Sequence, residues 1–363
     1  MRISIISFTE KGMVLSERIA EQITGQNVKQ SMKQTIKPQV RLFTRWSGSA
    51  SPIYAEQSLE AWTRAQMAEK NALLFIGACG IAVRAIAPSL TDKLHDSPVL
   101  VMDELGTYVI PILSGHMGGA NALAGELAEL TGAVPVITTA TDLNHAFAAD
   151  LFAKRNGLSI LNKEGIAKVS AKVLAGETVA MTVEAGHISG PDEVPRGLRL
   201  VPYPPNKPVD IAVTSKPEEL EVTAALWLKP REYVLGMGCR KKKEAEKIEA
   251  FALKHLREAG ISTEQLLMLT SIDKKEKEPG FLALSRRHNI PFVTYTAEQL
   301  QEAEGTFRTS DFVKMQVGVD NVCERSALLA CGPGGKLMME KRAEDGMTLA
   351  IARRKWSVKF DET

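Results

Sequence analysis

The sequence lacks the features that mark several common classes of protein. Its four cysteines, Cys79, Cys239, Cys323 and Cys331, form no C-x-x-C pair, which argues against a disulfide framework. Its six histidines show no H-x-x-x-H or H-E-x-x-H spacing, so we expect no metal held by protein side chains. No stretch approaches the roughly 18 apolar residues of a membrane span. The apolar start at Met1–Phe8 is too short for a signal peptide. These absences favour a cytoplasmic protein.

The sequence also has little net charge. Its 45 Lys and Arg residues nearly balance 43 Asp and Glu residues, which gives a formal charge of +2. A field this weak would not draw the whole chain to a nucleic acid or a membrane, so we expect neither as a partner. Hydrophobic residues make up 44% and charged residues 24%, the balance of a globular protein, and 363 residues suffice for two or three domains.

Short apolar runs bounded by glycine alternate with helix-period segments, as in a parallel sheet covered by helices. Leu73–Ile76 is typical of a strand, and Val99–Met102 and Tyr108–Leu113 flank a turn sequence and predict a hairpin. A second α/β unit begins near Tyr233. The pattern predicts an α/β protein with two Rossmann-like three-layer domains and a small middle α+β region. We expect an N-terminal α/β domain at 1–142, a middle or linker region at 143–229 and a C-terminal α/β domain at 230–363.

A glycine-rich loop spans residues 114–121, Ser-Gly-His-Met-Gly-Gly-Ala-Asn, between an expected strand and an amphipathic helix. Glycines here allow φ > 0 and can turn backbone N–H groups toward a ligand, and the helix N-terminus adds partial positive charge. The loop therefore suits a carboxylate, a phosphate or an oxyanion, although a tight turn without a ligand explains it equally well. It lacks the Gly-Lys-Ser/Thr ending of a P-loop, which argues against ATP.

Ionisable residues in the first half have a functional and a structural interpretation each. His116 lies in the glycine-rich loop, where an imidazole with a reference pKa of about 6.5 can move a proton, or can simply bond a neighbouring carbonyl. Asp142 follows a strand, where α/β proteins gather binding groups, or caps the next helix. Asp103 and Glu104 suit an acid/base pair or a turn. Arg84 would clamp a carboxylate or lie on a helix surface.

The second half carries a weaker glycine motif. Gly236-x-Gly238 follows an expected strand and opens a helix, but Lys241 replaces the third glycine of a dinucleotide fingerprint. The basic run Arg240–Lys243 is consistent with an acidic ligand or with a solvated surface. Ser271 lies at the end of another expected strand. Cys239 is either a nucleophile near a helix dipole or a small buried thiol.

Several of these segments together match one family. They are residues 80–88, 101–104, 114–121 and 135–142 in the first half, and 236–240, 271–273 with 278–280, and 349–353 in the second. With them the chain resembles the cobalt-precorrin-5A hydrolases, known as CbiG. The resemblance covers nearly the whole chain, and the middle region is its least distinctive part. One departure is Lys241-Lys242 after Gly-Met-Gly-Cys-Arg, where the family has Arg and then Gly.

The resemblance implies a reaction of anaerobic cobalamin biosynthesis. Water would open the ring A δ-lactone of cobalt-precorrin-5A, and acetaldehyde would leave to give cobalt-precorrin-5B. The substrate carries the cobalt and its conjugated macrocycle takes the electrons, so we expect no further cofactor. The expected partner is this small cobalt-corrinoid; other corrin-pathway enzymes or further copies of the chain are also candidates. The alternatives are a non-catalytic carrier of tetrapyrrole intermediates and a nucleotide-dependent oxidoreductase.

The candidate residues fall into two groups. His116 is expected to deprotonate the attacking water, with Asp103 or Glu104 orienting its imidazole from the neighbouring hairpin. If His116 does not act, the base is expected to be Glu104 or Asp142. The catalytic candidates are therefore His116, Glu104 and Asp142. The candidates for substrate binding are Arg84, Ser114, Gly115, Gly118, Gly119, Asn121, Thr139, Gly238, Arg240 and Ser271.

Overall fold

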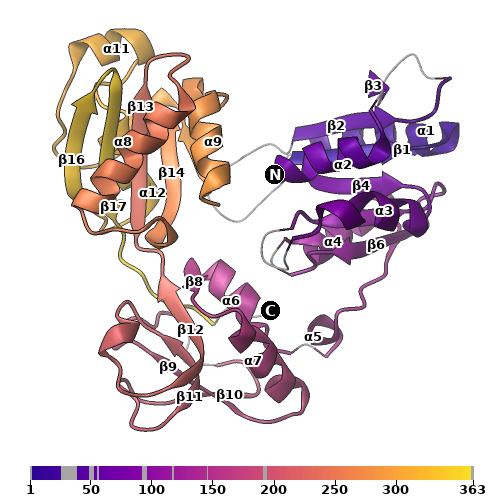
Figure 1. Cartoon of the computed structure of the whole chain (residues 1–363), viewed down its shortest axis with the longest axis horizontal. Coiled ribbons are helices and arrows are strands. Elements are labelled where there is room, and N and C mark those ends of the chain that lie inside the picture. Colours follow the sequence, from indigo (N-terminus) through magenta and orange to yellow (C-terminus); the bar gives the residue numbers. More distant parts are fainter. Residues whose placement is uncertain are drawn as a thin grey trace. The chain divides into compact units, whose positions relative to one another are not determined.

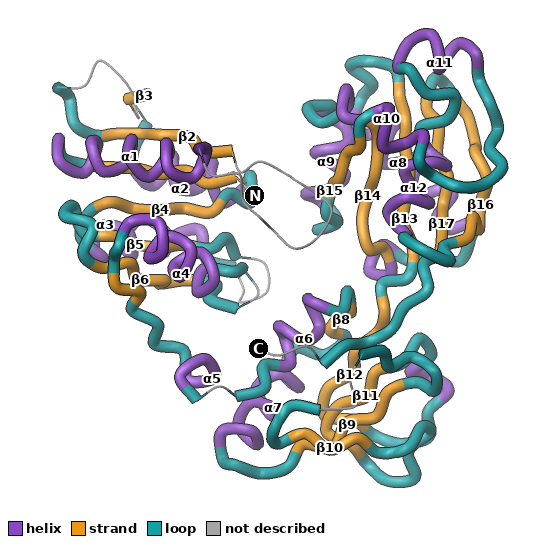
Figure 2. Tube along the Cα trace, turned by 180° about the vertical axis from the view of Figure 1, so that it is seen from behind, coloured by secondary structure: helices purple, strands orange, loops and turns teal. Residues whose placement is uncertain are grey.

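A computed structural model describes residues 2–25, 39–48, 53–54, 57–91, 96–116, 118–144, 146–190 and 194–360. Figures 1 and 2 show its helices and strands. The chain divides into two compact units, Met1–Ala146 and Phe147–Thr363. Within the described residues the first unit holds one sheet and the second holds two, so the predicted α/β class is confirmed. The domain boundaries at 142 and 229 stay predictions. Met1 and Met117, which belong to two of the segments above, lie outside the described residues.

The first unit is built on a sheet with the order β3-β2-β1-β4-β5-β6-β7. The first five strands along the chain run parallel, β6 runs antiparallel to β5, and β7 runs parallel to β6. All five residues of β4 are buried because helices cover both faces of the sheet. The strands are β1 (Arg2–Ser7), β2 (Gln39–Thr44), β3 (Ile53–Tyr54), β4 (Ala72–Ile76), β5 (Val99–Met102), β6 (Tyr108–Leu113) and β7 (Val134–Pro135).

Helices form the outer layers of this unit. The side chains of α1 (Glu10–Gly25) and α4 (Ala120–Thr131) share a core with one face of the sheet, and those of α2 (Leu59–Ala68) and α3 (Cys79–Ile86) share a core with the other. The amphipathic helix expected after the glycine-rich loop is confirmed, because Ala120, Leu123, Ala124 and Leu127 are buried along one face of α4. A short helix, α5 (Ala140–Leu143), follows β7.

The direction of β6 divides the loops of this unit between two edges of the sheet. Because β5 and β6 are antiparallel, their carboxyl ends lie at opposite edges. The loops after β1, β4 and β5 meet at one edge, and the loops after β6 and β7 meet at the other. The six residues of β6 separate the two edges by roughly 20 Å.

The second unit contains the middle sheet, with the order β10-β9-β11-β12-β8. Among the described strands, β9, β10, β11 and β12 run parallel, and β8 pairs antiparallel with β12. Residues 202–208, with their several prolines, connect β10 and β11 within this sheet. Its elements are α6 (Ala149–Arg155), β8 (Leu158–Ile160), α7 (Glu164–Leu174), β9 (Val179–Val183), β10 (Leu198–Leu200), β11 (Val209–Val213) and β12 (Ala224–Pro230).

The C-terminal sheet has the order β15-β14-β13-β17-β16 and ends in an antiparallel hairpin. Helices α8 and α9 cover one face and α12 covers the other. A Cβ on Gly236 would overlap the carbonyl oxygen of Cys323, so α12 lies directly against β13. The elements are β13 (Tyr233–Cys239), α8 (Ala245–Glu258), β14 (Leu266–Ile272), α9 (Pro279–Arg287), β15 (Phe292–Tyr295), α10 (Ala297–Gln301), α11 (Asp311–Val317), α12 (Cys323–Cys331), β16 (Lys336–Glu344) and β17 (Met347–Arg353).

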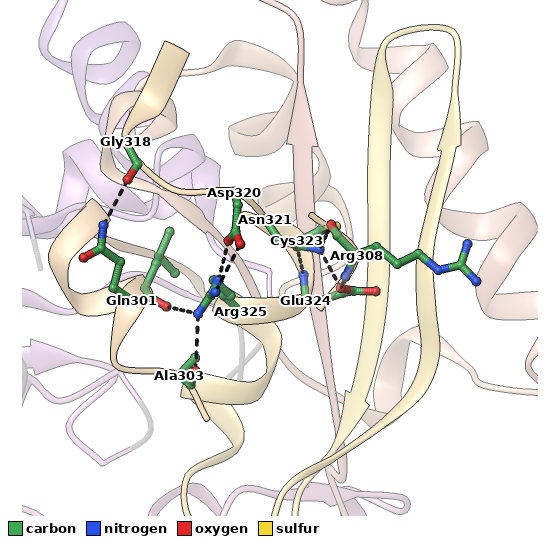
Figure 3. A network of polar contacts seen from close by, with 10 residues as sticks. Gln301, Ala303, Arg308, Gly318, Asp320, Asn321, Cys323, Glu324 and Arg325 are labelled. Atoms are coloured by element: carbon green, nitrogen blue, oxygen red, sulfur yellow. Dashed lines mark hydrogen bonds and ion pairs between the residues drawn. The ribbon is translucent and has the colours of Figure 1, made fainter. Parts of the chain in front are cut away.

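A buried carboxylate ties α12 to its neighbours, as Figure 3 shows in part. Glu324, only 1% exposed, accepts hydrogen bonds from the backbone N–H groups of Arg308 (3.0 Å) and Lys341 (2.7 Å) and from Asn321 Nδ2 (2.5 Å). In the same helix Arg325 pairs with Asp320. Since these polar groups satisfy one another inside the fold, we interpret this network as structural.

Candidate functional site

At the edge where β6 and β7 end, His116 meets a carboxylate. Its Nε2 lies 2.9 Å from Asp142 Oδ2 and 3.0 Å from Thr141 Oγ1. A carboxylate oxygen only accepts hydrogen bonds, so Nε2 carries a proton, and the basic lone pair of the neutral ring is then on Nδ1. Asp142 lies inside α5 rather than capping a following helix. Thr141, beside it on α5, is a contact of His116 that the sequence did not predict.

The carboxylate of Asp142 is itself held in place. Asn121 Nδ2 donates to Asp142 Oδ2 at 2.5 Å and to Thr139 Oγ1 at 3.1 Å. A Cβ on Gly115 would lie 2.6 Å from Asn121 Oδ1, so glycine leaves the room that this amide occupies. Asn121 and Thr139 were expected to bind substrate, and these contacts give them a role in positioning Asp142.

The glycine-rich loop closes on itself. The N–H groups of Gly119, Ala120 and Asn121 donate to the carbonyls of His116, Ser114 and Gly115 at 3.0, 3.1 and 3.1 Å. The expectation that the loop turns N–H groups toward a ligand is therefore wrong for these three. Three further features explain the compact turn. Ser114 Oγ donates a hydrogen bond to Asp96 O at 2.9 Å, and a Cβ on Gly118 would overlap Ser114. The backbone of Ser114 and of Gly119 is left-handed, with φ of 56° and 89°.

Partial burial strengthens the histidine–carboxylate contact. The side chain of His116 is 8% exposed and that of Asp142 is 33% exposed. With less water around them, the imidazole and the carboxylate interact more strongly than they would at an open surface. The arrangement can therefore accept a proton on the imidazole and stabilise the charge that results.

The predicted orienting role of Asp103 or Glu104 is wrong, because both lie at the opposite edge of the sheet. Asp103 accepts from the N–H groups of Leu105 (2.9 Å) and Tyr108 (2.6 Å) and so shapes the hairpin turn. Glu104 Oε2 accepts from Thr9 Oγ1 at 2.8 Å. The turn of an antiparallel hairpin and the loop that follows its second strand cannot meet, so Asp142 and Thr141 contact His116 instead.

Arg84 shares this second edge with Glu104. Its Nη1 donates to Gly80 O at 3.1 Å, and its side chain is exposed. Strands β1 and β4 are neighbours in the sheet. The chain passes from β1 to β2 on one side of this pair and from β4 to β5 on the other, so a topological switch point lies between β1 and β4. Open α/β sheets bind ligands outside the carboxyl ends of strands at such a point, and this favours Arg84 as a substrate contact.

The candidates in the C-terminal sheet lie at the carboxyl ends of β13 and β14. Arg240 has an exposed side chain and donates its backbone N–H to Gly346 O at 3.0 Å. At Gly238 a Cβ would lie 2.8 Å from Thr348 Oγ1. Ser271 is fully buried and donates its hydroxyl to Met237 O at 2.7 Å, so its hydroxyl links two strands.

A charged pair that the sequence did not predict lies next to these residues. Lys275 Nζ donates to Glu278 Oε2 at 2.6 Å, and the side chains are 12% and 6% exposed. Burial raises the pKa of the nearby Cys239 thiol above its ordinary value, although Lys275 acts in the opposite direction. A raised pKa disfavours the thiolate, which supports the buried-thiol interpretation of Cys239.

In the described part of the chain no three His, Cys, Asp or Glu residues form a group that could hold a metal ion. Nor does any described helix combine the length and apolar character needed to cross a membrane.

Two family patterns match this chain, one in each half. The pattern described as "Cobalamin synthesis G N-terminal" matches residues 61–142, which include Arg84, Glu104, His116 and Asp142. The pattern described as "Cobalamin synthesis G C-terminus" matches residues 233–352. The chain is also similar to a solved structure of a cobalamin biosynthesis protein G homologue from Sulfolobus solfataricus, with 22% identity, a TM-score of 0.41 and 97% of both chains covered.

Two curated relatives extend this match over most of the chain. A cobalt-precorrin-5A hydrolase from Salmonella typhimurium is 36% identical over 291 residues, which cover 77% of this chain and 81% of the relative. A cobalt-precorrin-5A hydrolase from Priestia megaterium is 33% identical over 297 residues, which cover 77% of this chain and 78% of the relative. With both terminal patterns matched in one polypeptide, the chain belongs to the CbiG family.

Proposed function

We propose that this protein hydrolyses the ring A δ-lactone of cobalt-precorrin-5A and releases acetaldehyde, giving cobalt-precorrin-5B in anaerobic cobalamin biosynthesis. Two relatives, 36% and 33% identical over 77% of this chain, are named for the hydrolysis. The observation that carries the proposal is the His116–Asp142 contact, held by Thr141 and Asn121 within a segment that matches the family. We place the enzyme in the cytoplasm, acting on a small corrinoid and on neither a nucleic acid nor a membrane.

His116 is the proposed base for lactone opening. Its Nε2–H faces Asp142, so Nδ1 takes a proton from water as the oxygen attacks the lactone carbonyl. Asp142 then stabilises the imidazolium, as the aspartate of a Ser-His-Asp triad does. The acyl–oxygen bond breaks, and the alkoxide that leaves takes a proton back. The products are a carboxylic acid, which gives its proton to water and becomes a carboxylate, and an alcohol.

Arg84 is the proposed contact for a peripheral carboxylate of the substrate. Its guanidinium can bond a carboxylate with two parallel N–H groups, and its position at a switch point is where α/β sheets bind ligands. Arg240, exposed at the end of β13, is the corresponding candidate in the second unit. In this proposal the substrate carries the cobalt and its macrocycle takes the electrons of C–C cleavage, so the protein supplies no further cofactor.

The test is an anaerobic incubation of the purified protein with the cobalt-lactone intermediate. Acetaldehyde and the opened corrinoid are assayed separately, without added NAD(P)H, ATP or zinc. We expect both products in equal amounts from the parent protein, and much less of both from a His116→Gln variant. A strict requirement for one of those additives contradicts the proposal. Tight binding of the lactone without any turnover indicates a carrier of tetrapyrrole intermediates instead.

A further inference from the structure

The middle sheet has a switch point of its own. Strands β9 and β11 are neighbours in the sheet. The chain passes from β9 to β10 on one side of this pair and from β11 to β12 on the other side. Glu184 directly follows β9, and Thr214 and Ser215 directly follow β11, so their side chains meet where open α/β sheets bind ligands. These residues lie outside both matched segments, 61–142 and 233–352.

The carboxylate of Glu184 is held firmly. Its Oε2 accepts from Thr214 Oγ1 at 3.0 Å, from Ser215 N at 2.6 Å and from Ser215 Oγ at 2.8 Å. Burial alone would raise the pKa of Glu184, but the hydrogen bonds from Ser215 and Thr214 and the nearby His187 outweigh it and lower the pKa below its ordinary value. The group therefore stays ionised, with its second oxygen, Oε1, directed toward His187.

His187 is oriented for proton transfer. Its Nδ1 lies 2.8 Å from the carbonyl oxygen of Trp356, and a carbonyl only accepts, so Nδ1 carries the proton and Nε2 is the basic nitrogen of the neutral ring. Nε2 lies 3.8 Å from Glu184 Oε1, which is longer than a hydrogen bond. The side chains of His187 and Glu184 are 30% and 22% exposed. Nε2 and Oε1 both accept hydrogen bonds and a hydroxyl group has one proton, so a ligand hydroxyl donates to Nε2 alone. Glu184 Oε1 lies close enough to stabilise the imidazolium that proton transfer then forms.

The segment after β17 fixes the imidazole. Its ring stacks on the indole of Trp356, with centroids 3.8 Å apart and an interplanar angle of 9°. Val358 N donates to His187 O at 2.8 Å, and Ser189 N donates to Val358 O at 2.9 Å. Trp356 is 5% exposed and Val358 is fully buried, so this segment is firmly packed.

Two cationic side chains lie near Glu184, and each is in an ion pair with another glutamate. Arg353 bonds Glu232 Oε1 through Nε (3.0 Å) and Nη2 (2.7 Å), and the charge of Glu184 also acts on it. The ion pair with Glu219 raises the pKa of Lys216, and the charge of Glu184 also raises it. The side chains of Arg353 and Lys216 are 46% and 59% exposed, so a ligand carboxylate can exchange with the glutamate of either pair. A base beside such pairs fits a ligand that presents a hydroxyl next to carboxylates.

We propose that His187, backed by Glu184, is a second proton-transfer residue that acts on the alcohol freed by lactone opening. This proposal rests on the proposed function. The hydroxyl O–H bond breaks and its proton goes to Nε2 of His187, where Glu184 stabilises the imidazolium. The carbonyl of acetaldehyde forms as the C–C bond breaks, and the electron pair of that C–C bond passes into the conjugated macrocycle. The imidazole then returns the proton to water.

The test is the molar ratio of acetaldehyde to lactone-opened corrinoid. In the parent protein we expect a ratio near one. His187→Gln should lower the ratio by about 10²-fold, the usual cost of losing a general base, because the opened alcohol accumulates. Glu184→Gln should lower it less, because the imidazole remains. His116→Gln should lower both products together and leave the ratio near one.

A matched control is His288→Gln. His288 is also partly exposed and is paired with a glutamate, Glu249, at 2.7 Å, but it lies outside the proposed site, so its ratio should equal that of the parent. Trp356→Phe keeps the backbone carbonyl and an aromatic ring, so it should change the ratio less than Trp356→Ala. Both variants are compared as folded protein, because a loss of stability alone would give the same order.

The outcomes separate the two proposals. If the parent opens no lactone and releases no acetaldehyde, the proposed function fails. If the parent turns over and folded His187→Gln protein keeps a ratio near one, the role of His187 is overturned. If His187→Gln does not fold, folded Glu184→Gln decides, and a ratio within about twofold of the parent then overturns the proposal.

Discussion

The two edges of the N-terminal sheet carry different kinds of polar residues. At one edge, His116, Asp142 and Asn121 form a connected network with contacts of 2.5 to 2.9 Å. At the other, Arg84 and Glu104 have separate contacts, with Gly80 and Thr9, and do not share one. A connected network fixes a proton position, which is what acid–base catalysis needs, whereas a separate exposed cation suits binding. In the proposed function, one domain therefore places proton transfer and anion binding at the ends of different strands.

The largest expected effect is at the networked edge. His116→Gln keeps polarity and approximate size but removes the base, so turnover should fall about 10²–10⁴-fold while substrate binding changes little. Single-turnover rates and the absorbance change on substrate binding measure the two quantities. Turnover within a few-fold of the parent would remove His116 from the mechanism.

A smaller effect is expected from disturbing the network without touching the imidazole. Gly115→Ala places a methyl group against Asn121 Oδ1 and should displace the amide that holds Asp142. Loss of one hydrogen bond to a charged group, about 1.5–3 kcal/mol, corresponds to roughly a 10–100-fold lower kcat. Gly125→Ala is the control, because a Cβ there meets nothing within 4 Å. Equal kcat values for the two variants contradict the positioning role of Asn121.

At the other edge we expect a change in binding rather than in rate. Arg84→Lys keeps the charge but loses the two-pronged geometry, so KM should rise about tenfold with a smaller change in kcat. A steady-state titration separates the two parameters. If kcat falls and KM does not rise, Arg84 acts in the chemical step, and the contrast between the edges breaks down.

The smallest effect is expected at Glu104. Glu104→Gln keeps an oxygen that can accept from Thr9 Oγ1, so turnover should stay within about twofold of the parent. The same turnover assay, run beside His116→Gln, ranks the edges directly. A loss at Glu104 as large as that at His116 would make Glu104 the base and reverse the assignment.

Much of the local structure could be predicted from the sequence. The bounds of β5 and β6 and the buried stripe of α4 follow from apolar periodicity and turn residues. The residues of the candidate network were also in view, because His116, Asn121 and Asp142 lie in segments that carry the family resemblance. Which of these residues pair was not in view, because Thr141, which lies in one of these segments, has no ionisable side chain and Glu104 is nearer to His116 in sequence than Asp142 is.

The sequence by itself determined the α/β class, the hairpin and the glycine-rich loop, because these depend on backbone preferences and periodicity over a few residues. Only the tertiary structure decided which side chains meet. The antiparallel direction of β6 separates Glu104 from His116 and brings Asp142 to it across 26 residues. Likewise, the segment that follows β17 brings Trp356 into contact with His187, 169 residues earlier in the sequence. Strand order and direction set such contacts, and no local pattern encodes them.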